Sequence, residues 1–405
     1  MHYRPAKAGE IWALHRVIAG SVANAVRVLH LFPRFRPNFA GDGLYFEKLW
    51  PHLAATGGGH DVLVFTTPAP TEIPPVAPPG MNLIYLRRSE RESVRAVLLR
   101  YYLWLLRNIR HYDIIHARTH IDRFFVSNGI ARLAGVRFIY SATLDDSPPY
   151  ILKTYRPSFW RFVAWAMRTT MTRLVVLNRR LYDESAAFMG APGRVVIVPQ
   201  GVTVPERIAD ADARRAALDI PRDAVVQLYV GSISRRKDVL FLIENLAALN
   251  ADGKARYLVM LGPALEPEYR AELDTAIAAL SVTDRVRFVG YRDDPSSFYC
   301  MANVFVFASW LEGFPNVLAE AMAYGLPIVA RRLEGVTDFV LADGDTGLLF
   351  DTAAEFCALI RRIESEGGLA ERLGRNARAK AAGDYSMAAV ASIYAALYRS
   401  VLTTG

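Results

Sequence analysis

Cysteine and long apolar runs are both scarce in this sequence. Its 405 residues include only two cysteines, Cys300 and Cys357, and both stand in apolar surroundings. So few cysteines cannot build a disulfide framework, which indicates a reducing compartment. No apolar run reaches the roughly 20 residues that a membrane-spanning helix needs. Residues 1–26 are interrupted by His15 and Arg16, so we do not interpret them as a signal peptide. The sequence therefore predicts a cytoplasmic protein.

Acidic residues are scarce in the first half of the chain. Residues 1–200 carry 26 Lys and Arg against 13 Asp and Glu, whereas residues 201–405 carry 22 against 27. Two segments, 89–110 and 150–173, mix arginines with aromatic residues, as interfacial helices do. Core helices with a solvated arginine face would show the same pattern. We find no nucleic-acid-binding motif and expect no nucleic acid partner, whereas an anionic membrane surface or an anionic acceptor would suit the charge.

The spacing of metal-binding side chains is also missing. His116 and His120 are four residues apart, but they follow a strand and have no third ligand near them in the sequence. Asp145 and Asp146 are adjacent, which is not the D-x-D spacing that bridges a divalent metal and a diphosphate. We therefore predict no metal site.

The sequence does contain alternating strands and helices, with a hydrophobic content of 52% that is ample for two cores. Short apolar runs that end in Gly, Pro or polar residues predict buried parallel strands. We expect an α/β protein with a first domain at 1–203, joined by a final helix at 385–405, and a second domain at 204–384. The predicted strands include VRVLHLF, DVLVFTT, DIIHAR, RFIYSA, TRLVVLN, RVVIVPQGV, AVVQLYVGS, RYLVMLGP, RVRFVGYRDD and NVFVFAS.

The stretch from Ser309 to Ala330 predicts a strand, a loop, a helix that starts near Pro315 and ends at Gly325, and a second strand. Side chains lean toward a helix N-terminus, so Glu320 should point back at the loop that holds Glu312. The N–H groups at the helix start favour an anion, and Glu320 can accept hydrogen bonds from hydroxyl groups. A phosphate-bearing sugar fits both demands. An ordinary surface helix with a Gly-bearing entry explains the spacing equally well.

Two other loops carry candidate chemistry. Lys237, in SRRKD, comes just before a predicted helix, where it can meet a phosphate as a point charge. Gly41 and Gly43 lie in a predicted loop, AGDG, whose glycines would let a ligand approach the backbone closely. This loop lacks the third glycine of the dinucleotide fingerprint.

In this order, the pieces resemble the retaining glycosyltransferases of the GT4 family, which have the GT-B fold of two facing Rossmann-like domains with a last helix that crosses back to the first. The resemblance covers nearly the whole chain. Its most specific part is Glu312 to Glu320, which looks like the family's E-x7-E motif and is followed by AMAYGLPIVA. Supporting matches are the Gly41 loop, DIIHAR, VIVPQGV, YVGSISRRKD, VMLGP, RFVGYRDD and the ending DYSMAAVASIYAALYRSVL.

The resemblance implies a role for each matching residue. Glu320 would bind the nucleotide ribose, Glu312 the donor sugar, and Lys237 the departing diphosphate. It implies catalytic roles for Glu312 and Lys237, and an acceptor-side loop at Gly41 and Gly43. Asp145, or His116 from the preceding loop, would be catalytic in place of a His that the family has and this sequence lacks. The donor-binding residues would be Glu320, Gly313, Phe314, Asn316, Val317, Ser232, Arg236, Gly262, Tyr291 and Arg292, with Tyr291 and Arg292 near the base.

The implied function is transfer of a sugar, with retention of configuration, from a UDP- or GDP-type donor to a glycan, lipid-linked or other hydroxyl acceptor. It belongs to cell-envelope or exopolysaccharide synthesis, needs no cofactor or metal, and takes place in the cytoplasm or on the inner face of the membrane. Two departures keep alternatives open. Ser232 stands where many members have Arg, and SATLDD stands where the family has a His. A degenerate protein that binds sugar nucleotide or glycan without turnover, or an epimerase or phosphorylase on the same fold, therefore stays an alternative, although no pyridoxal-phosphate lysine motif is apparent.

Overall fold

The structure is a computed structural model that describes residues 26–32, 35, 41–65, 77–86, 93–118, 121–143, 157–206 and 211–403. Contacts divide the chain into two compact units. Unit 1 comprises Met1–Pro199 and Met387–Gly405, and unit 2 comprises Gln200–Ser386. No helix in the described part of the chain is both long and apolar enough to cross a bilayer.

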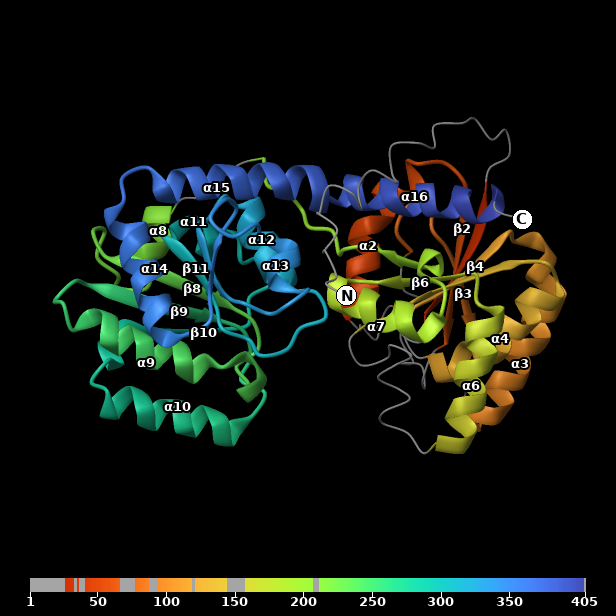
Figure 1. Ribbon diagram of the computed structural model, residues 1–405, viewed down its shortest axis with the longest axis horizontal. Helices are drawn as coiled ribbons and strands as arrows, with labels where there is room; N and C mark the ends of the chain where they lie inside the picture. The colour runs from red at the N-terminus through yellow and green to blue at the C-terminus, as the bar shows by residue number, and fades with distance from the viewer. Residues whose placement is uncertain are drawn as a thin grey trace, which may run out of the picture. The chain divides into compact units, whose positions relative to one another are not determined.

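Unit 1 is built on a seven-stranded, wholly parallel sheet in the order β3-β2-β1-β4-β5-β6-β7 (Figure 1). Side chains of β1 alternate between the two faces, and Val28 and Phe32 pack in a core formed by the sheet with helices α2 and α16. The strands are β1 (Arg27–Phe32), β2 (Gly59–Phe65), β3 (Asn82–Leu86), β4 (Ile114–Arg118), β5 (Arg137–Ser141), β6 (Arg173–Val176) and β7 (Val195–Ile197).

The helices of unit 1 follow the crossover pattern that parallel strands require. Helix α4 packs against β4, β5 and helices α3 and α6. The helices are α2 (Gly41–Ala54), α3 (Val94–Asn108), α4 (Ile121–Leu133), α6 (Pro157–Thr170), α7 (Arg179–Met189) and α16 (Met387–Thr403), with short 3-10 turns η2 (Ile109–His111) and η3 (Pro192–Arg194).

Unit 2 repeats this architecture with a six-stranded parallel sheet in the order β10-β9-β8-β11-β12-β13. Its strands are β8 (Val225–Val230), β9 (Arg256–Leu261), β10 (Val286–Gly290), β11 (Val304–Phe307), β12 (Ile328–Arg331) and β13 (Leu348–Phe350). Its helices are α8 (Ala211–Ala216), α9 (Val239–Asn250), α10 (Pro267–Ala279), α11 (Ser296–Met301), α12 (Asn316–Ala323), α13 (Thr337–Val340), α14 (Ala353–Ser365) and α15 (Leu369–Lys380). Two 3-10 turns, η4 (Arg235–Lys237) and η5 (Thr283–Arg285), and a short π-helix, η6 (Ala381–Tyr385), complete the unit.

Both sheets place their first strand beside their fourth, as in the Rossmann fold, so the predicted α/β class with two Rossmann-like domains is confirmed. At such a switch point the connections leave in opposite directions, and ligands bind outside the carboxyl ends of the two strands. In unit 2 these strands are β8 and β11, and in unit 1 they are β1 and β4.

The structure corrects three local expectations. Gly41 and Gly43 belong to the first turn of α2 and not to a loop, and Asp42 between them suits the positive end of a helix. The helix expected from residue 89 begins at Val94, because Ser93 caps it by accepting a hydrogen bond from the Ala96 N–H. The short strands β3 and β13 were not expected.

Candidate functional site

The switch point of unit 2 holds Lys237 and Glu312, two of the four residues for which we expect a catalytic role. Lys237 follows β8 and Glu312 follows β11, and because these strands are neighbours their loops meet. The Lys237 Nζ atom forms a salt bridge with Glu312 Oε1, and Arg236 Nη1 lies 3.3 Å from Glu312 Oε2. The side chains of Lys237 and Glu312 are only 13% and 8% exposed. A buried carboxylate is therefore held between two cations.

Backbone hydrogen bonds lock the two loops to each other. The carbonyl oxygen of Arg236 accepts from the Trp310 N–H at 3.0 Å and from the Ser309 hydroxyl at 3.2 Å. The Arg236 guanidinium in turn donates to the Leu311 carbonyl. These bonds fix the position of the cations relative to Glu312, which is the preorganisation that stabilises developing charge.

Two glycines bring the neighbouring strand ends together. Gly231 follows β8 and Gly262 follows β9, and both have φ values that side chains rarely adopt, 152° and 139°. A Cβ atom at Gly262 would lie 1.9 Å from the carbonyl oxygen of Gly231, so no other residue fits there without moving the backbone. Backbone packing therefore requires glycine at position 262, apart from the donor-binding role that the resemblance implies.

Glu320 lies on α12, eight residues after Glu312. The α12 helix begins at Asn316 after Pro315 and ends before Gly325, whose φ is 73°, as the sequence predicts. The Glu320 carboxylate accepts a hydrogen bond from the Tyr299 hydroxyl at 2.8 Å. Burial, followed by the charge of Glu320, raises the pKa of Tyr299 well above its usual value, so Tyr299 stays a hydrogen-bond donor.

The other residues predicted to bind the donor fall along the same carboxyl edge. Ser232 follows Gly231, and its carbonyl accepts from the Tyr229 hydroxyl at 2.7 Å. Tyr291 and Arg292 directly follow β10 and are exposed. Phe314 is buried against the ring of Tyr385, whereas Gly313 and Val317 are half-buried and Asn316 is exposed. In sheet order the predicted base site therefore lies on the β10 side of β8.

His116 is fully buried in unit 1. Its Nδ1 is 2.8 Å from the Tyr398 hydroxyl and its Nε2 is 2.7 Å from the Ser141 hydroxyl. Burial, followed by the charge of Arg118, lowers the pKa of His116 well below 6.5, so the ring is neutral. Both ring nitrogens of His116 are thus engaged by hydroxyl groups. The catalytic role of His116 stays a prediction.

The switch point of unit 1 brings the first turn of α2 near the end of β4. Arg118 is 2% exposed, and its Nη1 lies 4.0 Å from Asp42, between Gly41 and Gly43. Its guanidinium also lies 4.9 Å from the centroid of the Phe46 ring. Asp145, the remaining predicted catalytic residue, lies outside the described residues.

Three contacts of the unit 2 site escaped the sequence reasoning. The resemblance implies that Arg236 binds the donor, but the pairing of Arg236 with Glu312 depends on how two loops meet. Tyr299, which orients Glu320, lies on α11 and carries no spacing signal that links it to α12. The ring of Trp310 stacks on Arg331, which is at the end of β12. The only sequence signal for this contact was the presence of an aromatic residue two positions before Glu312.

The described residues contain no group of three His, Cys, Asp or Glu side chains that could hold a metal ion. Lys237 and Arg236, the cations paired with Glu312, can meet an anion at this site.

Comparison with solved structures identifies the class of fold. The crystal structure of Anabaena Alr3699/HepE in complex with UDP and glucose superposes with a TM-score of 0.72 at 18% sequence identity, and covers 93% of this chain and 100% of that one. The protein thus has the GT-B fold, which consists of two Rossmann-like domains.

Sequence comparison then gives the family. Residues 40–201 match the glycosyl transferase 4-like domain, and residues 210–380 match the glycosyl transferases group 1. The chain belongs to the GT4 family of glycosyltransferases.

Two curated relatives illustrate the range of the family. The lipopolysaccharide core biosynthesis glycosyltransferase LpsE of Rhizobium meliloti (strain 1021) is 36% identical over 188 residues, which are 46% of this chain and 53% of that protein. The match thus spans about half the length of that relative. The alpha-D-kanosaminyltransferase of Streptomyces kanamyceticus is 26% identical over 392 residues, which cover 88% of this chain and 99% of that protein.

Proposed function

We propose that this protein transfers a hexosyl group, with retention of configuration, from a UDP- or GDP-sugar to a hydroxyl group of a glycan or lipid-linked acceptor in cell-envelope polysaccharide synthesis. The observation that carries the proposal is the cluster of Lys237, Arg236 and Glu312 at the switch point of unit 2. The UDP and glucose bound by the Anabaena neighbour and the lipopolysaccharide role in the name of the Rhizobium relative support the donor class and the pathway.

The chemistry follows from where charge develops. As the bond between the sugar carbon and the diphosphate breaks, the electron pair leaves with the diphosphate. The acceptor oxygen bonds to the carbon, and its hydroxyl proton is taken up by the released diphosphate or by water. Lys237 and Arg236 would stabilise the growing negative charge of the leaving group. Because these two cations can do so, the proposal needs no metal ion. Glu312 would bind the sugar and Glu320 the ribose hydroxyl groups.

Release of nucleoside diphosphate from purified protein tests this proposal. UDP-glucose, UDP-galactose, UDP-N-acetylglucosamine and GDP-mannose would each be supplied with a core oligosaccharide freed of its lipid. We expect release with one donor, full activity in the presence of EDTA, and loss of release in Lys237→Ala. Donor binding without release under any acceptor would instead favour the degenerate alternative, which the serine at position 232 motivates.

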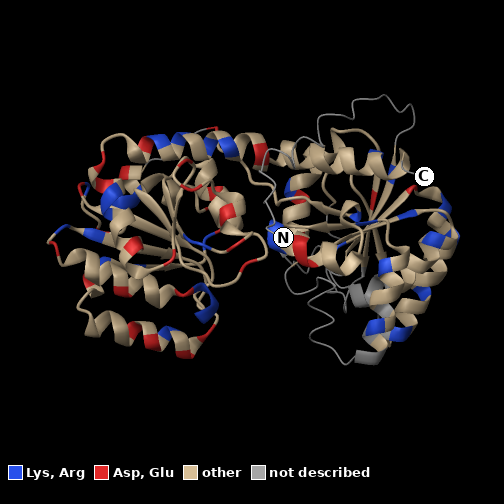
Figure 2. Cartoon of the chain, viewed as in Figure 1, with Lys and Arg blue, Asp and Glu red and all other residues tan. Residues whose placement is uncertain are grey.

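We propose further that unit 1 docks on an anionic membrane surface through helices α3, α4 and α6. These three helices carry seven arginines and one aspartate, and the blue patches over them are plain in Figure 2. Apolar side chains on the same helices face solvent. They are Leu99, Leu103 and Leu106 on α3, Leu133 on α4, and Phe159, Phe162 and Trp165 on α6. Aromatic residues and arginines together suit the lipid headgroup region.

Flotation with liposomes tests this surface. Each arginine near an anionic bilayer contributes about 1 kcal/mol, and apolar insertion adds to that. We expect the protein to float with vesicles that contain 30% or so phosphatidylglycerol, and less with pure phosphatidylcholine. The double variant Phe162→Ser/Trp165→Ser should lose flotation and keep its activity on a soluble acceptor. Equal flotation with both lipids would refute the charge argument.

A further inference from the structure

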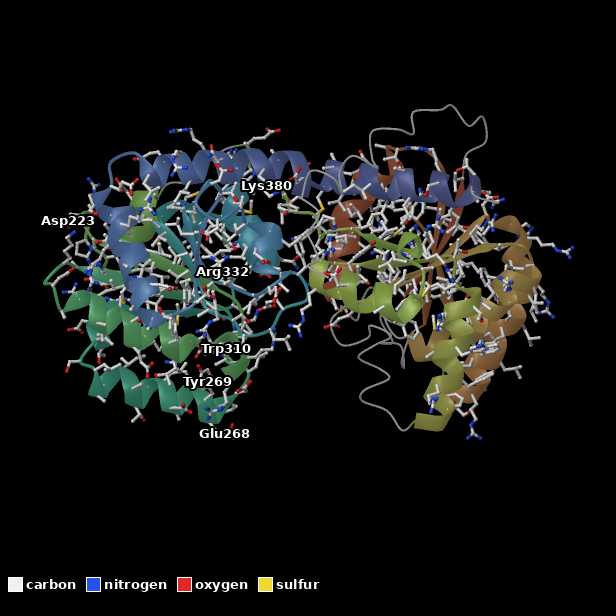
Figure 3. All side chains as sticks on the ribbon, viewed as in Figure 1. Asp223, Glu268, Tyr269, Trp310, Arg332 and Lys380 are labelled. Carbon is white, nitrogen blue, oxygen red and sulfur yellow. The ribbon has the colours of Figure 1, made fainter. Side chains whose placement is uncertain are left out.

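Trp310 is an exposed tryptophan beside the proposed catalytic cluster. It stands two residues before Glu312, and the sequence has no other tryptophan between residues 200 and 386. Its side chain is 58% exposed, although residues this large and apolar are usually mostly buried. Figure 3 labels it, seen in this view between Arg332 and Tyr269. An exposed aromatic ring next to a polar site needs an explanation.

The ring of Trp310 is held in place from behind. Its backbone N–H donates to the Arg236 carbonyl at 3.0 Å, which ties it to the loop that carries Lys237. The guanidinium carbon of Arg331 lies 3.6 Å from the centroid of the ring. Arg331 is 5% exposed, and its Nη2 is bound to the Asp238 carboxylate at 2.6 Å. One face of the indole is thus covered by an anchored cation, and the exposed area belongs to the rest of the ring.

The sheet order separates Trp310 from the predicted base site at Tyr291, although Trp310 also contacts the loop after β8 through Arg236 and Asp238. Trp310 stacks on a residue of β12, and β12 lies on the far side of β11 from β8, β9 and β10. Tyr291, predicted to lie near the base, follows β10 at the other end of this row. A donor whose base lies at Tyr291 and whose sugar lies at Glu312 would end before it reached the indole. The ring is therefore placed for a group at or beyond the sugar end of the donor.

We propose that Trp310 is a stacking platform for a pyranose ring, which would be the acceptor sugar or the sugar that is being transferred. The inference rests on the proposed function of the same site. A flat, electron-rich face that is fixed in position suits the apolar C–H face of a sugar, while hydroxyl groups at the edge of that sugar reach polar neighbours. Arg331 and Asp238 are then positioning residues, because they hold the platform and do not touch the sugar.

Steady-state kinetics of three variants test the platform. Trp310→Ala removes the stacking face, Trp310→Phe keeps a smaller one, and Leu280→Ala, at an exposed apolar side chain directly after helix α10, is the control. With UDP-glucose and the lipid-free core oligosaccharide as probes, we expect Trp310→Ala to raise a KM about tenfold or more and Trp310→Phe less than threefold. A rise in the oligosaccharide KM assigns the acceptor sugar, and a rise in the donor KM assigns the transferred sugar. Unchanged KM values for both probes in a folded Trp310→Ala would overturn the proposal.

Fluorescence separates failure of the platform from failure of the proposed function. The emission of Trp310 is obtained as the difference between wild-type protein and Trp310→Phe, and it is then titrated with the oligosaccharide and with UDP-glucose. Quenching by either probe supports the platform even if the wild-type protein releases no UDP, which would sink the catalytic proposal alone. UDP release together with an emission that neither probe changes would sink the platform alone.

Discussion

Removing charges from the pair of Lys237 and Glu312 separates their structural from their catalytic contribution. The two side chains are nearly buried, so Lys237→Met leaves the Glu312 carboxylate with only Arg236, at 3.3 Å. Removing one partner of a buried ion pair lowers the free energy of unfolding by about 3 to 5 kcal/mol. Because Arg236 still compensates the Glu312 charge in part, we expect a loss near the lower figure, about 3 kcal/mol. In a domain of this size that lowers the melting temperature by about 6 to 12 °C.

The double variant Lys237→Met/Glu312→Gln restores neutrality. It has no unpaired buried charge, so its melting temperature should return to within about 3 °C of the wild-type value, which corresponds to about 1 kcal/mol. Its activity should not return, because it lacks the cation at the leaving group, and such a loss typically lowers kcat about 100-fold to 1000-fold.

Calorimetry and a UDP-release assay on the four proteins of this cycle are the measurements. A double variant that recovers wild-type activity together with its stability would refute the reasoning, because the effect of Lys237 would then be purely structural. A single variant that melts like the wild type would show instead that the salt bridge is not closed in solution.

Three further predictions concern other contacts. Glu320→Gln should raise the KM for the nucleotide sugar about tenfold at constant kcat, because an amide accepts hydrogen bonds from the ribose more weakly than a carboxylate does. Tyr299→Phe should raise this KM less. Equal losses of kcat in the two variants would contradict the role assigned to Glu320. The pKa of His60 is lowered by burial to about 4, so the unfolded chain binds a proton between pH 6.5 and 5 that the folded chain does not. Stability should fall by up to about 2 kcal/mol per such histidine on acidification over this range, and His60→Gln should flatten the profile of melting temperature against pH. Arg256 is fully buried, with Nε 2.6 Å from Glu364 Oε1 and Nη2 2.8 Å from Oε2, so Arg256→Lys should lower the melting temperature by 6 °C or so even though the charge is kept; an unchanged value would argue against the bidentate geometry.

Most of the strands could be predicted because buried parallel strands are continuous apolar runs. β9, for example, is buried at every position, and its run RYLVML stands out in the sequence. β3 was missed because it is only half-buried or exposed along its length, which leaves a weak pattern after a Pro-rich stretch. The first turn of α2 could not be predicted, because a glycine on each side of Asp42 is more typical of a loop than of a helix.

The site could be predicted only in part for a related reason. The spacing of Glu312 and Glu320 is a local property of one loop and one helix, so the sequence carries it. The salt bridge between Lys237 and Glu312 joins residues 75 positions apart, and the stacking of Trp310 on Arg331 joins two strand ends. Such contacts depend on the order of strands in the sheet, which local patterns do not specify.

The closeness of Gly231 and Gly262 has a consequence for anyone who wishes to alter donor preference. The loops after β8 and β9 meet closely at the backbone of Gly231 and Gly262, and a Cβ atom at Gly262 has no space. Most variants at position 262 in a mutagenesis library should therefore misfold, whichever donor sugar the library is designed to select. Loop grafts between family members should carry both segments together, since each is shaped against the other and neither is an independent module.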